Sequence, residues 1–332
     1  MTKILLPHQP GHYAAFPTAL VHDGQLLVFY RVAQASRSGI HGLAGSVRRI
    51  AFALPAFLDA LDDPSVDNLY PLGEDRAVFC EHNEMDAIIS APQGLGFALA
   101  TRWFDQQGMQ TFMSFNPHQP EFTARAAVKV PGTQWLAFYG KGLAVGDDMV
   151  FTAYGALPGA QHAHPLLVKP ESGDRWSLLA ALPSNFLWEG APVVLNECSL
   201  VRWQDQYHLF MRRDSFPFGI WHARSADLLT WTQPEPLLDM AHAPMALVFG
   251  DRLWLVFRHL IADDEAAIAV LEPFGATGLT QLERYSGSPY DGGYGDPVAL
   301  ADRVLVVYYC GNAEGEPFLK VCDLRDHLES LS

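Results

Sequence analysis

One two-strand unit recurs along the chain and restricts its fold more than any other feature of the sequence. In its clearest copy, turn-forming residues from Gly293 to Pro297 lead into an apolar run. A polar turn at Arg303 then precedes a second apolar run, Val304 to Tyr309. Runs of this length on either side of a polar turn are typical of a β-hairpin. Further copies run from Phe16 to Arg31, Asp86 to Arg102, Lys141 to Tyr154, Asn196 to Arg213, and Ala243 to Arg258.

A repeat of strand pairs at intervals of roughly 45–70 residues indicates a ring of similar sheets. We therefore predict an all-β fold, a six-bladed β-propeller, with a five-bladed propeller as the alternative, in one domain over residues 1–332. Asp23-Gly24 between two apolar runs is a strong hairpin signal within the first copy. The short apolar run from Lys3 to Leu6 is placed to pair with the last blade and close the ring.

The composition supports a globular protein and excludes some classes of partner. Among the 332 residues, 49% are apolar and 18% charged, which is enough for a packed core. The net charge of −15 disfavours nucleic acid and anionic membranes as partners. We see neither a signal peptide nor an apolar run of the ~20 residues that a membrane helix needs, so we expect a cytoplasmic protein. The four cysteines lie far apart, which favours buried free thiols and predicts neither a metal site nor a cofactor.

Polar side chains gather at two places in the repeated unit, the start of its first strand and the end of its second. Because the two strands are antiparallel, these places lie on the same face of every blade. We therefore expect these side chains to converge on one mouth of the propeller. Arginine donates hydrogen bonds in pairs and is suited to bind a carboxylate or sugar hydroxyls. The predicted site residues are Glu197, Tyr294 and Asp296 at strand starts, and Arg31, Arg102, Tyr154, Arg212, Arg213, Arg258 and Tyr308 at strand ends.

Three stretches resemble motifs of the sialidase (neuraminidase) superfamily. Asn196-Glu197, followed after one hairpin by Arg212-Arg213, resembles the fourth-blade motif of sialidases. The stretch from Gly293 to Asp296 resembles their last-blade motif, which carries a nucleophilic tyrosine. The stretch from Ser225 to Trp231 is similar to a shortened Asp-box, a structural turn of the same superfamily. The chain is thus identified as a divergent member with a BNR/Asp-box-like propeller.

This resemblance implies a retaining exo-glycosidase that acts on an acidic or polyhydroxylated sugar. Tyr294 would be the nucleophile, and Glu197 would take its proton, because a tyrosine hydroxyl with a pKa near ~10 needs an adjacent base. Sialidases with a tyrosine nucleophile are a known exception to the two-carboxylate rule of glycosidases. Arg212, Arg213 and Arg258 would bind the sugar.

The sequence departs from the sialidase pattern at two positions. The arginine expected just before the first Pro is replaced by Ala15-Phe16, although Arg31 at the other end of that hairpin is a candidate substitute. The loop after the first hairpin contains no acid, so His41, whose unperturbed pKa is near ~6.5, is a candidate general acid. Asp86, near the start of the second copy, is the other candidate, together with its neighbours Glu81, His82 and Glu84.

Three alternatives remain open. The first is a non-catalytic propeller that binds a glycan or a protein. The second is a polysaccharide lyase that uses Tyr294 and His41 as base and acid. The third is a five-bladed hydrolase of the arabinanase type, in which Asp86, Glu197 and Asp296 would be the three acids.

Overall fold

The computed structural model describes residues 2–35, 43–79, 84–90, 97–105, 108–116, 126–171, 175–275, 278–286, 291–311 and 316–325. The chain divides into two compact units. Unit 1 comprises Met1–Ala87 and Trp254–Ser332, and unit 2 comprises Ile88–Leu253. The expectation of a single domain over residues 1–332 stays a prediction.

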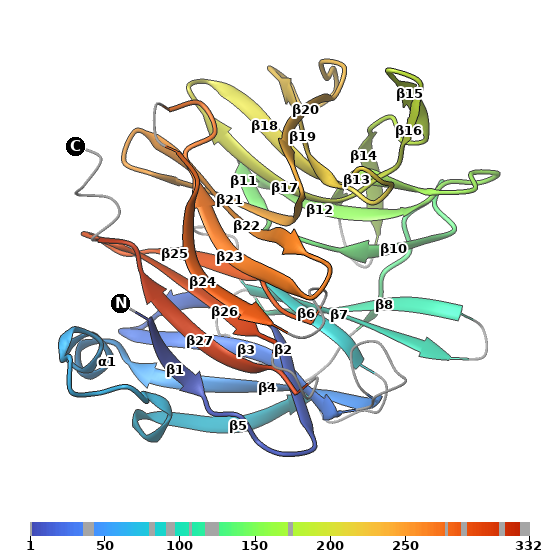
Figure 1. The fold of residues 1–332 in the computed structure, drawn as a ribbon. Helices are drawn as coiled ribbons and strands as arrows, with labels where there is room; N and C mark the ends of the chain where they lie inside the picture. Colours follow the sequence, from blue (N-terminus) through green and yellow to red (C-terminus); the bar gives the residue numbers. More distant parts are fainter. Residues whose placement is uncertain are drawn as a thin grey trace. The chain divides into compact units, whose positions relative to one another are not determined.

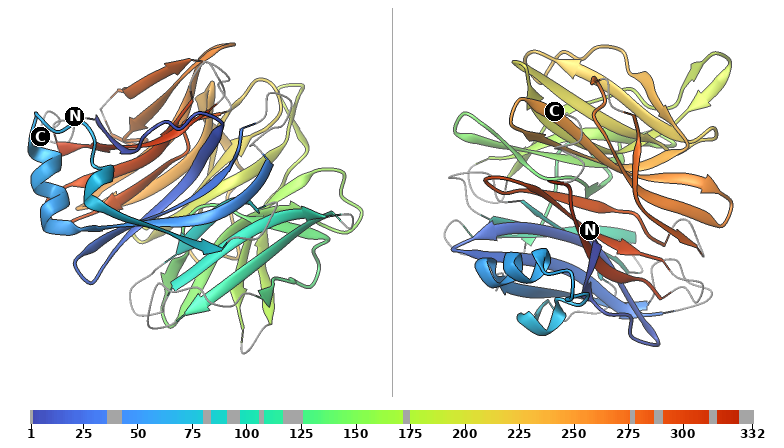
Figure 2. Two further views of the ribbon diagram at one scale, coloured as in Figure 1. Left: turned by 90° about the horizontal axis from the view of Figure 1, so that it is seen from below. Right: turned by 60° about the vertical axis from the view of Figure 1, so that its left-hand side comes forward.

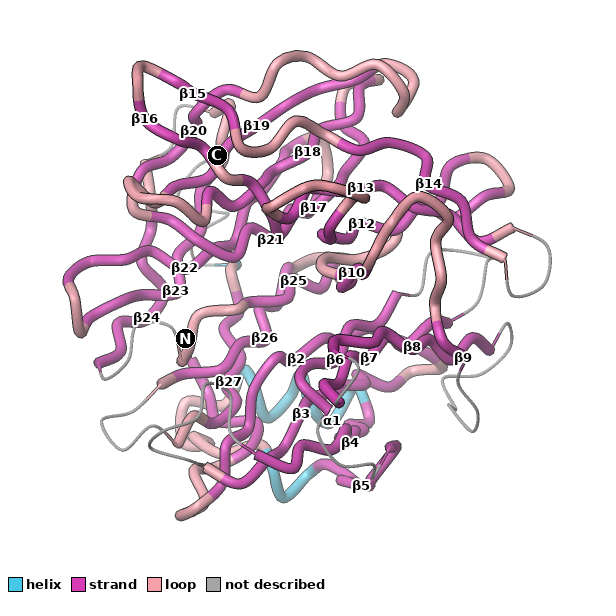
Figure 3. The backbone as a smooth tube through the Cα atoms, turned by 90° about the vertical axis from the view of Figure 1, so that its right-hand side faces the viewer, coloured by secondary structure: helices cyan, strands magenta, loops and turns pink. Residues whose placement is uncertain are grey.

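The described part of the chain is almost entirely β-structure (Figures 1 and 3). Its strands form six sheets of four or five strands and one two-stranded ribbon. The helical elements named within this part are α1 (Leu54–Asp62) and the short 3-10 helix η1 (Tyr70–Leu72). The all-β prediction is therefore confirmed, while the number of blades stays a prediction.

Unit 1 contains two complete sheets. The first has the order β2-β3-β4-β5, with β2 (His12–His22), β3 (Gln25–Gln34), β4 (Leu43–Ala53) and β5 (Gly73–Phe79). The second has the order β1-β27-β26-β25, with β1 (Thr2–Leu6), β25 (Gly295–Ala299), β26 (Val304–Cys310) and β27 (Phe318–Asp323). The N-terminal strand thus pairs with β27, the last strand of the described residues, as expected for Lys3 to Leu6, and Figure 2 shows it among the C-terminal strands.

Unit 2 also contains two complete sheets and the ribbon. One sheet has the order β10-β12-β13-β14, with β10 (Trp135–Phe138), β12 (Asp148–Ala156), β13 (Ala163–Pro170) and β14 (Trp176–Ala181), and β11 (Leu143–Val145) pairs with β12. The other has the order β17-β18-β19-β20, with β17 (Leu195–Trp203), β18 (Gln206–Arg213), β19 (Gly219–Ser225) and β20 (Glu235–Asp239). The ribbon consists of β15 (Phe186–Trp188) and β16 (Ala191–Val193).

The remaining two sheets follow the same meander. One has the order β6-β7-β8-β9, with β6 (Glu84–Ser90), β7 (Phe97–Asp105), β8 (Gly108–Asn116) and β9 (Ala126–Ala127). The other has the order β21-β22-β23-β24, with β21 (Ala241–Phe249), β22 (Arg252–Ala262), β23 (Glu265–Leu271) and β24 (Thr280–Ser286).

The repeated unit of the sequence has a common backbone feature at the start of its first strand. Phe16 and Ala243, each followed by a proline, adopt left-handed backbone angles with φ of 52° and 54°. The register of β2 against β3 shifts between Ala15 and Thr18, and that of β17 against β18 shifts between Leu195 and Cys198. Such bulges turn residues out of the hydrogen-bonded ladder. The strand starts are therefore shaped to present side chains such as Glu197 rather than to continue the sheet.

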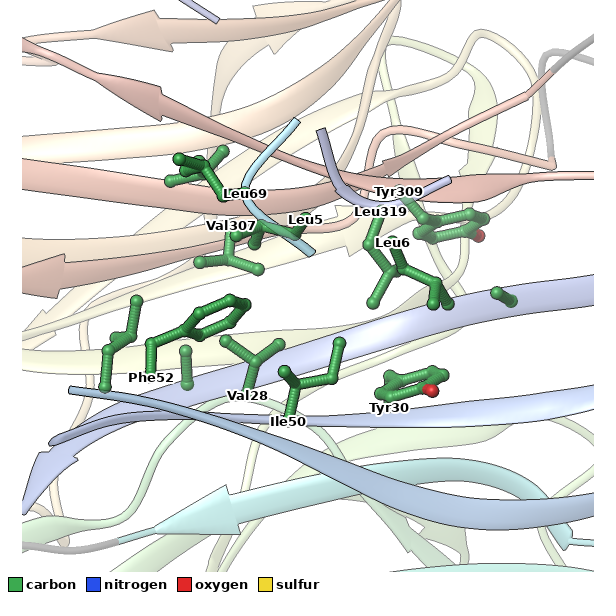
Figure 4. Close-up of a cluster of buried hydrophobic side chains, with 14 of the residues drawn as sticks. Leu5, Leu6, Val28, Tyr30, Ile50, Phe52, Leu69, Val307, Tyr309 and Leu319 are labelled. Atoms are coloured by element: carbon green, nitrogen blue, oxygen red, sulfur yellow. The ribbon is translucent and has the colours of Figure 1, made fainter. Parts of the chain in front are cut away.

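Each unit has its own hydrophobic core. In unit 1, Val28, Ile50 and Phe52 of the first sheet pack in one cluster with Val307 and Leu319 of the second (Figure 4). Helix α1 adds the buried side chains of Phe57 and Leu61 to this cluster. The buried Lys3 ammonium donates hydrogen bonds to the carbonyls of Ala60 and Asp63, where a cation is favoured by the C-terminal end of the helix.

In unit 2, one cluster surrounds Met211 and Trp221, and a second surrounds Phe138 and Phe151. The Asp-box-like stretch forms a tight structural turn, as expected. Asp227 accepts hydrogen bonds from the N–H groups of Leu229 and Thr230, and the Trp231 indole donates to the Leu228 carbonyl.

Two further expectations concern the chain as a whole. Cys198, Cys310 and Cys322 are buried free thiols, as predicted, while Cys80 lies outside the described residues. No helix in the described ranges is long and apolar enough to span a membrane.

Candidate active site

In unit 1, Tyr294 lies beneath a buried arginine. Arg258, on β22, is 1% exposed, and its guanidinium carbon is 4.8 Å from the centroid of the Tyr294 ring. The Arg258 Nε donates a hydrogen bond of 2.6 Å to the Gly292 carbonyl, which fixes the orientation of the guanidinium fork. Tyr294 directly precedes β25, so the loop that orients Arg258 also carries the tyrosine beneath it.

The loop approaches Arg258 closely because positions 292 and 293 are glycines. A Cβ atom at Gly292 would lie 2.6 Å from the Tyr285 ring, and one at Gly293 would lie 2.7 Å from the Tyr285 hydroxyl. The second would also lie 3.0 Å from Cγ of Arg258. Gly293 in addition has a φ of 75°, which L-residues rarely adopt. The glycine pair is therefore a requirement of close packing around Arg258 and Tyr285.

A second arginine lies beside a tyrosine that contacts the same loop. The Tyr13 hydroxyl on β2 donates a hydrogen bond of 2.8 Å to Asp291. The guanidinium carbon of Arg31, on β3, is 5.9 Å from the Tyr13 ring centroid, and Arg31 is 2% exposed. Arg31 is also the direct cross-strand partner of Ala15. Directly opposite residues of an antiparallel pair place their side chains on the same face.

Three tyrosines around the loop from Asp291 to Tyr294 have raised pKa values. Burial, and after it the proximity of Tyr309 and Asp291, holds the pKa of Tyr13 well above its usual value, although Arg31 opposes the shift. Burial likewise holds the pKa of Tyr309 well above its usual value. Burial raises the pKa of Tyr285 to about 12, against the opposing effect of Arg258. All three are therefore neutral hydroxyls at physiological pH.

Tyr294 differs from these tyrosines because its side chain is only partly buried. Its ring meets Phe16 edge-on at 5.5 Å and lies 6.0 Å from the fully buried ring of Tyr309. Phe16 and Tyr309 are themselves 5.3 Å apart. The aromatic support and Arg258 hold Tyr294 in place while leaving part of it accessible.

In unit 2, the start of β17 and the end of β18 form an ion-paired group. Arg212 Nη1 donates a hydrogen bond of 3.0 Å to Glu197, and its Nη2 donates one of 2.7 Å to Asp214. The Glu197 side chain is 7% exposed and that of Arg212 is 15% exposed. The Asn196 side-chain oxygen accepts the backbone N–H of Glu197 at 2.7 Å, which fixes the bulge that presents the carboxylate. One arginine thus joins two carboxylates at the end of the sheet where β17 begins and β18 ends.

Two other predicted residues of unit 2 make packing contacts. Arg213 donates hydrogen bonds to the Pro192 carbonyl at 2.8 Å and to the Ser215 hydroxyl at 3.2 Å. Its guanidinium carbon lies 5.8 Å from the Trp221 ring centroid, so Arg213 fastens the loop after β18. Tyr154 on β12 meets the Trp135 ring edge-on at 6.0 Å.

Asp296 and Tyr308 are placed differently from expectation. The buried Asp296 carboxylate accepts hydrogen bonds from the Ala19 N–H at 2.6 Å and from the Thr18 hydroxyl at 3.1 Å, which ties β25 to β2. The Tyr308 hydroxyl donates to Glu283 at 2.5 Å. Since neighbouring residues of a strand face opposite ways, Tyr309 and not Tyr308 joins the cluster around Tyr294.

The side chains of the last three predicted residues, His41, Asp86 and Arg102, are not described by the structure. His41 lies outside the described residues, and only the backbone is described for Asp86 on β6 and Arg102 on β7. Within the described ranges, no group of three or more His, Cys, Asp or Glu side chains could hold a metal ion.

The structure adds four residues that sequence reasoning missed: Tyr13, Tyr285, Asp291 and Tyr309. The only sequence signal for them was the glycine pair, which marks a close approach by other side chains.

Comparisons with known proteins show similarity in fold only. No family model matches the chain, and no curated protein matches its sequence. The sialidase of Trypanosoma rangeli in complex with the inhibitor DANA is similar in structure, with a TM-score of 0.67 and 12% sequence identity over 96% of this chain and 56% of the sialidase. The ectodomain of the hemagglutinin-neuraminidase of parainfluenza virus 5 has a TM-score of 0.60 and 10% identity over 96% of this chain and 84% of that one.

This chain therefore spans a little more than half the length of the trypanosomal sialidase that it matches. The similarity over nearly the whole chain shows that the protein has the all-β propeller fold of these sialidases.

Proposed function

We propose that this protein is a sialidase-like exo-glycosidase that acts on an acidic or polyhydroxylated sugar. The observation that carries the proposal is the placement of Tyr294, a partly exposed hydroxyl on an aromatic support with the Arg258 guanidinium 4.8 Å from its ring. A buried cation next to a tyrosine favours negative charge on the phenol oxygen, which is the charge that develops when the hydroxyl loses its proton.

Glu197 is the base that we propose for Tyr294. Tyr294 directly precedes the first strand of its sheet, Glu197 lies near the start of the first strand of its own sheet, and Glu197 is held by Arg212 at 3.0 Å. In a propeller with one blade for each of the six sheets, which we also propose, such positions face the same mouth.

The proposed reaction has two steps. In the first, Glu197 takes the Tyr294 proton, the phenol oxygen bonds to the anomeric carbon, and the bond to the leaving group breaks. His41 or Asp86 gives the leaving oxygen its proton. In the second, water gives a proton to the group that protonated the leaving oxygen and attacks the same carbon, while the bond to the Tyr294 oxygen breaks and Glu197 returns the proton to that oxygen, which gives retention of configuration. Arg31 would supply a cation near the position at which sialidases have an arginine, because it stands directly opposite Ala15.

The test is a screen of the purified protein against aryl glycosides of sialic acid, uronic acids, rhamnose and arabinose. Tyr294→Phe and Glu197→Gln are expected to lower kcat at least a hundredfold on any substrate that turns over, since each removes a group needed for the covalent step. Leu229→Ser, an exposed position on the Asp-box-like turn, is the control. Equal turnover by the wild type and both variants would refute the mechanism.

A non-catalytic glycan-binding propeller is the second candidate. The observation in its favour is the substitution of Ala15 at the arginine position, together with the burial of Arg31 against Tyr13. In that case no aryl glycoside of the screen would be turned over, and Glu197→Gln would weaken the binding of a sugar to the protein when binding is measured directly.

A further inference from the structure

Large apolar side chains are exposed around the loop that follows β18, in the same unit as Glu197. Leu187 and Phe216 are both 74% exposed, more than any other large hydrophobic side chain of the described residues. Met240, at 38%, is exposed as well. Single exposed apolar residues are normal on protein surfaces, but a group of them in adjoining segments marks a binding site.

Hydrogen bonds join the three segments that carry these side chains. The Ser215 hydroxyl donates to the Pro192 carbonyl at 2.8 Å, and Pro192 is the cross-strand partner of Leu187 in the β15–β16 ribbon. The Met240 N–H donates to the Phe218 carbonyl at 3.0 Å. The Phe216 and Phe218 rings pack edge-on at 6.0 Å. The exposed side chains are therefore held by an ordered framework.

The face of the β15–β16 ribbon that carries Phe186 and Trp188 fixes the orientation of the ribbon. Phe186 and Trp188 pack against the buried Trp221 ring at 5.7 Å and 5.3 Å. Because side chains alternate along a strand, Leu187 between them must point away from this contact. Figure 1 shows the β15–β16 ribbon standing apart from the larger sheets.

The apolar group is adjacent in sequence and structure to the ion-paired group of the proposed site. Asp214, which shares Arg212 with Glu197, is two residues before Phe216. Arg213 fastens the same loop to Pro192. A substrate whose sugar is bound at Glu197 would therefore have this surface next to it.

We infer that Leu187, Phe216 and Met240 bind the apolar aglycone of the substrate, an aryl or alkyl group attached to the sugar that is released. This inference deepens the proposed function and rests on it. The three side chains are apolar, and Asp214, two residues before Phe216, is already paired with Arg212. Burying the three side chains would favour an apolar group by removing their surface from water, whereas a second sugar would need additional hydrogen-bonding groups. A protein partner would need an area far larger than three side chains provide.

The first experiment measures binding of the aglycone alone and does not depend on catalysis. The probe is 4-methylumbelliferone at pH 6, followed by saturation-transfer difference NMR with the full chain. The wild type and the Leu229→Ser control are expected to give equal signals, because Leu229 lies on the loop at the opposite end of β19. Phe216→Ala and Leu187→Ser are each expected to lower the signal about three- to tenfold.

The inference is overturned by no signal with the wild type, or by equal signals in the control and in both variants. Leu187→Ser provides the result independently if Phe216→Ala does not fold, and Leu187→Ser and Leu229→Ser are matched in chemistry and exposure.

The second experiment uses turnover. With a sugar identified by the screen, Leu187→Ser should lower kcat/KM for the 4-methylumbelliferyl glycoside about three- to tenfold and leave that for the methyl glycoside unchanged. An equal change for both glycosides would overturn the inference. Failure of the proposed mechanism would give a different result from failure of this inference. Tyr294→Phe would then retain turnover, while the variants of Phe216 and Leu187 would still bind 4-methylumbelliferone more weakly.

Discussion

The close packing of the loop before Tyr294 makes Gly293→Ala a sensitive test of the candidate site. Two costs arise. The first is the left-handed backbone, with φ of 75°, which costs an L-residue roughly 1–2 kcal/mol. The second is the new methyl group, which would lie 2.7 Å from the Tyr285 hydroxyl and 3.0–3.1 Å from the Arg258 side chain. Overpacking of this kind costs about 1–3 kcal/mol.

Gly24→Ala is the matched control for the backbone cost. Gly24 lies in the same unit, in the turn between β2 and β3, and has a φ of 71° with no atom within 4 Å of a built Cβ. The two variants change the unfolded chain in the same way, so this contribution cancels in the comparison. In urea unfolding, Gly293→Ala is expected to lose about 1–3 kcal/mol more than Gly24→Ala.

The functional consequence follows from the same contacts. A methyl group at position 293 would push the loop away from Arg258 and disturb the 2.6 Å hydrogen bond to the Gly292 carbonyl. Turnover is then expected to fall at least about tenfold in Gly293→Ala, since small displacements of reacting groups have large effects, and to be unchanged in Gly24→Ala. Equal losses of stability in the two variants, within about 0.5 kcal/mol, would refute the packing account.

Asp296→Ala is expected to lower the free energy of unfolding by about 1–3 kcal/mol, because it leaves the buried Ala19 N–H without its acceptor. Asp296→Asn keeps an acceptor oxygen and should lose less in the same urea titration; equal losses would contradict the structural role. Burial, with smaller contributions from His208 and Arg224, lowers the pKa of His222 from 6.5 to about 4. The unfolded chain therefore binds a proton first as the pH falls below about 6.5, and up to about 3 kcal/mol of stability is lost between there and pH 4. His222→Gln should remove this part of the pH dependence of thermal unfolding, and identical pH profiles for both proteins would speak against it.

The hairpins, and the location of Glu197 and Arg212 at the same end of one hairpin, could be predicted from the sequence. Asp23-Gly24 predicts the turn between β2 and β3, and both residues adopt the positive φ that such a turn requires. Glu197 and Arg212 are predicted at the start and the end of one hairpin, on the same face, and the structure has them in an ion pair of 3.0 Å. Both features depend on residues close together in the chain, for which turn chemistry and strand alternation are sufficient.

The sequence could not predict which of Tyr308 and Tyr309 points its side chain toward Tyr294. All residues of β26, from Val304 to Cys310, are buried, so the strand has no alternation of apolar and polar residues to distinguish its two faces. The choice between neighbouring tyrosines then depends on contacts with other sheets. The same limit applies to Tyr13 and Asp291, whose hydrogen bond joins residues 278 positions apart.

The glycines on either side of Tyr294 nevertheless indicate indirectly that this tyrosine is functional. Side chains at Gly292, Gly293 and Gly295 would each come within 3.0 Å of neighbouring atoms, from Tyr285 at the first two positions and from Ile268 at the third. Tyr294 is thus the one residue in this stretch of four that has room for a side chain. Packing alone explains the glycines, because each is required where another chain segment approaches. Packing does not explain why the remaining residue is a partly exposed tyrosine beneath a buried arginine, since an exposed position accepts many residue types. A chemical role for the Tyr294 hydroxyl does explain it, and Tyr294→Phe, which keeps the ring and its contacts with Phe16, Tyr309 and Arg258, separates the two accounts.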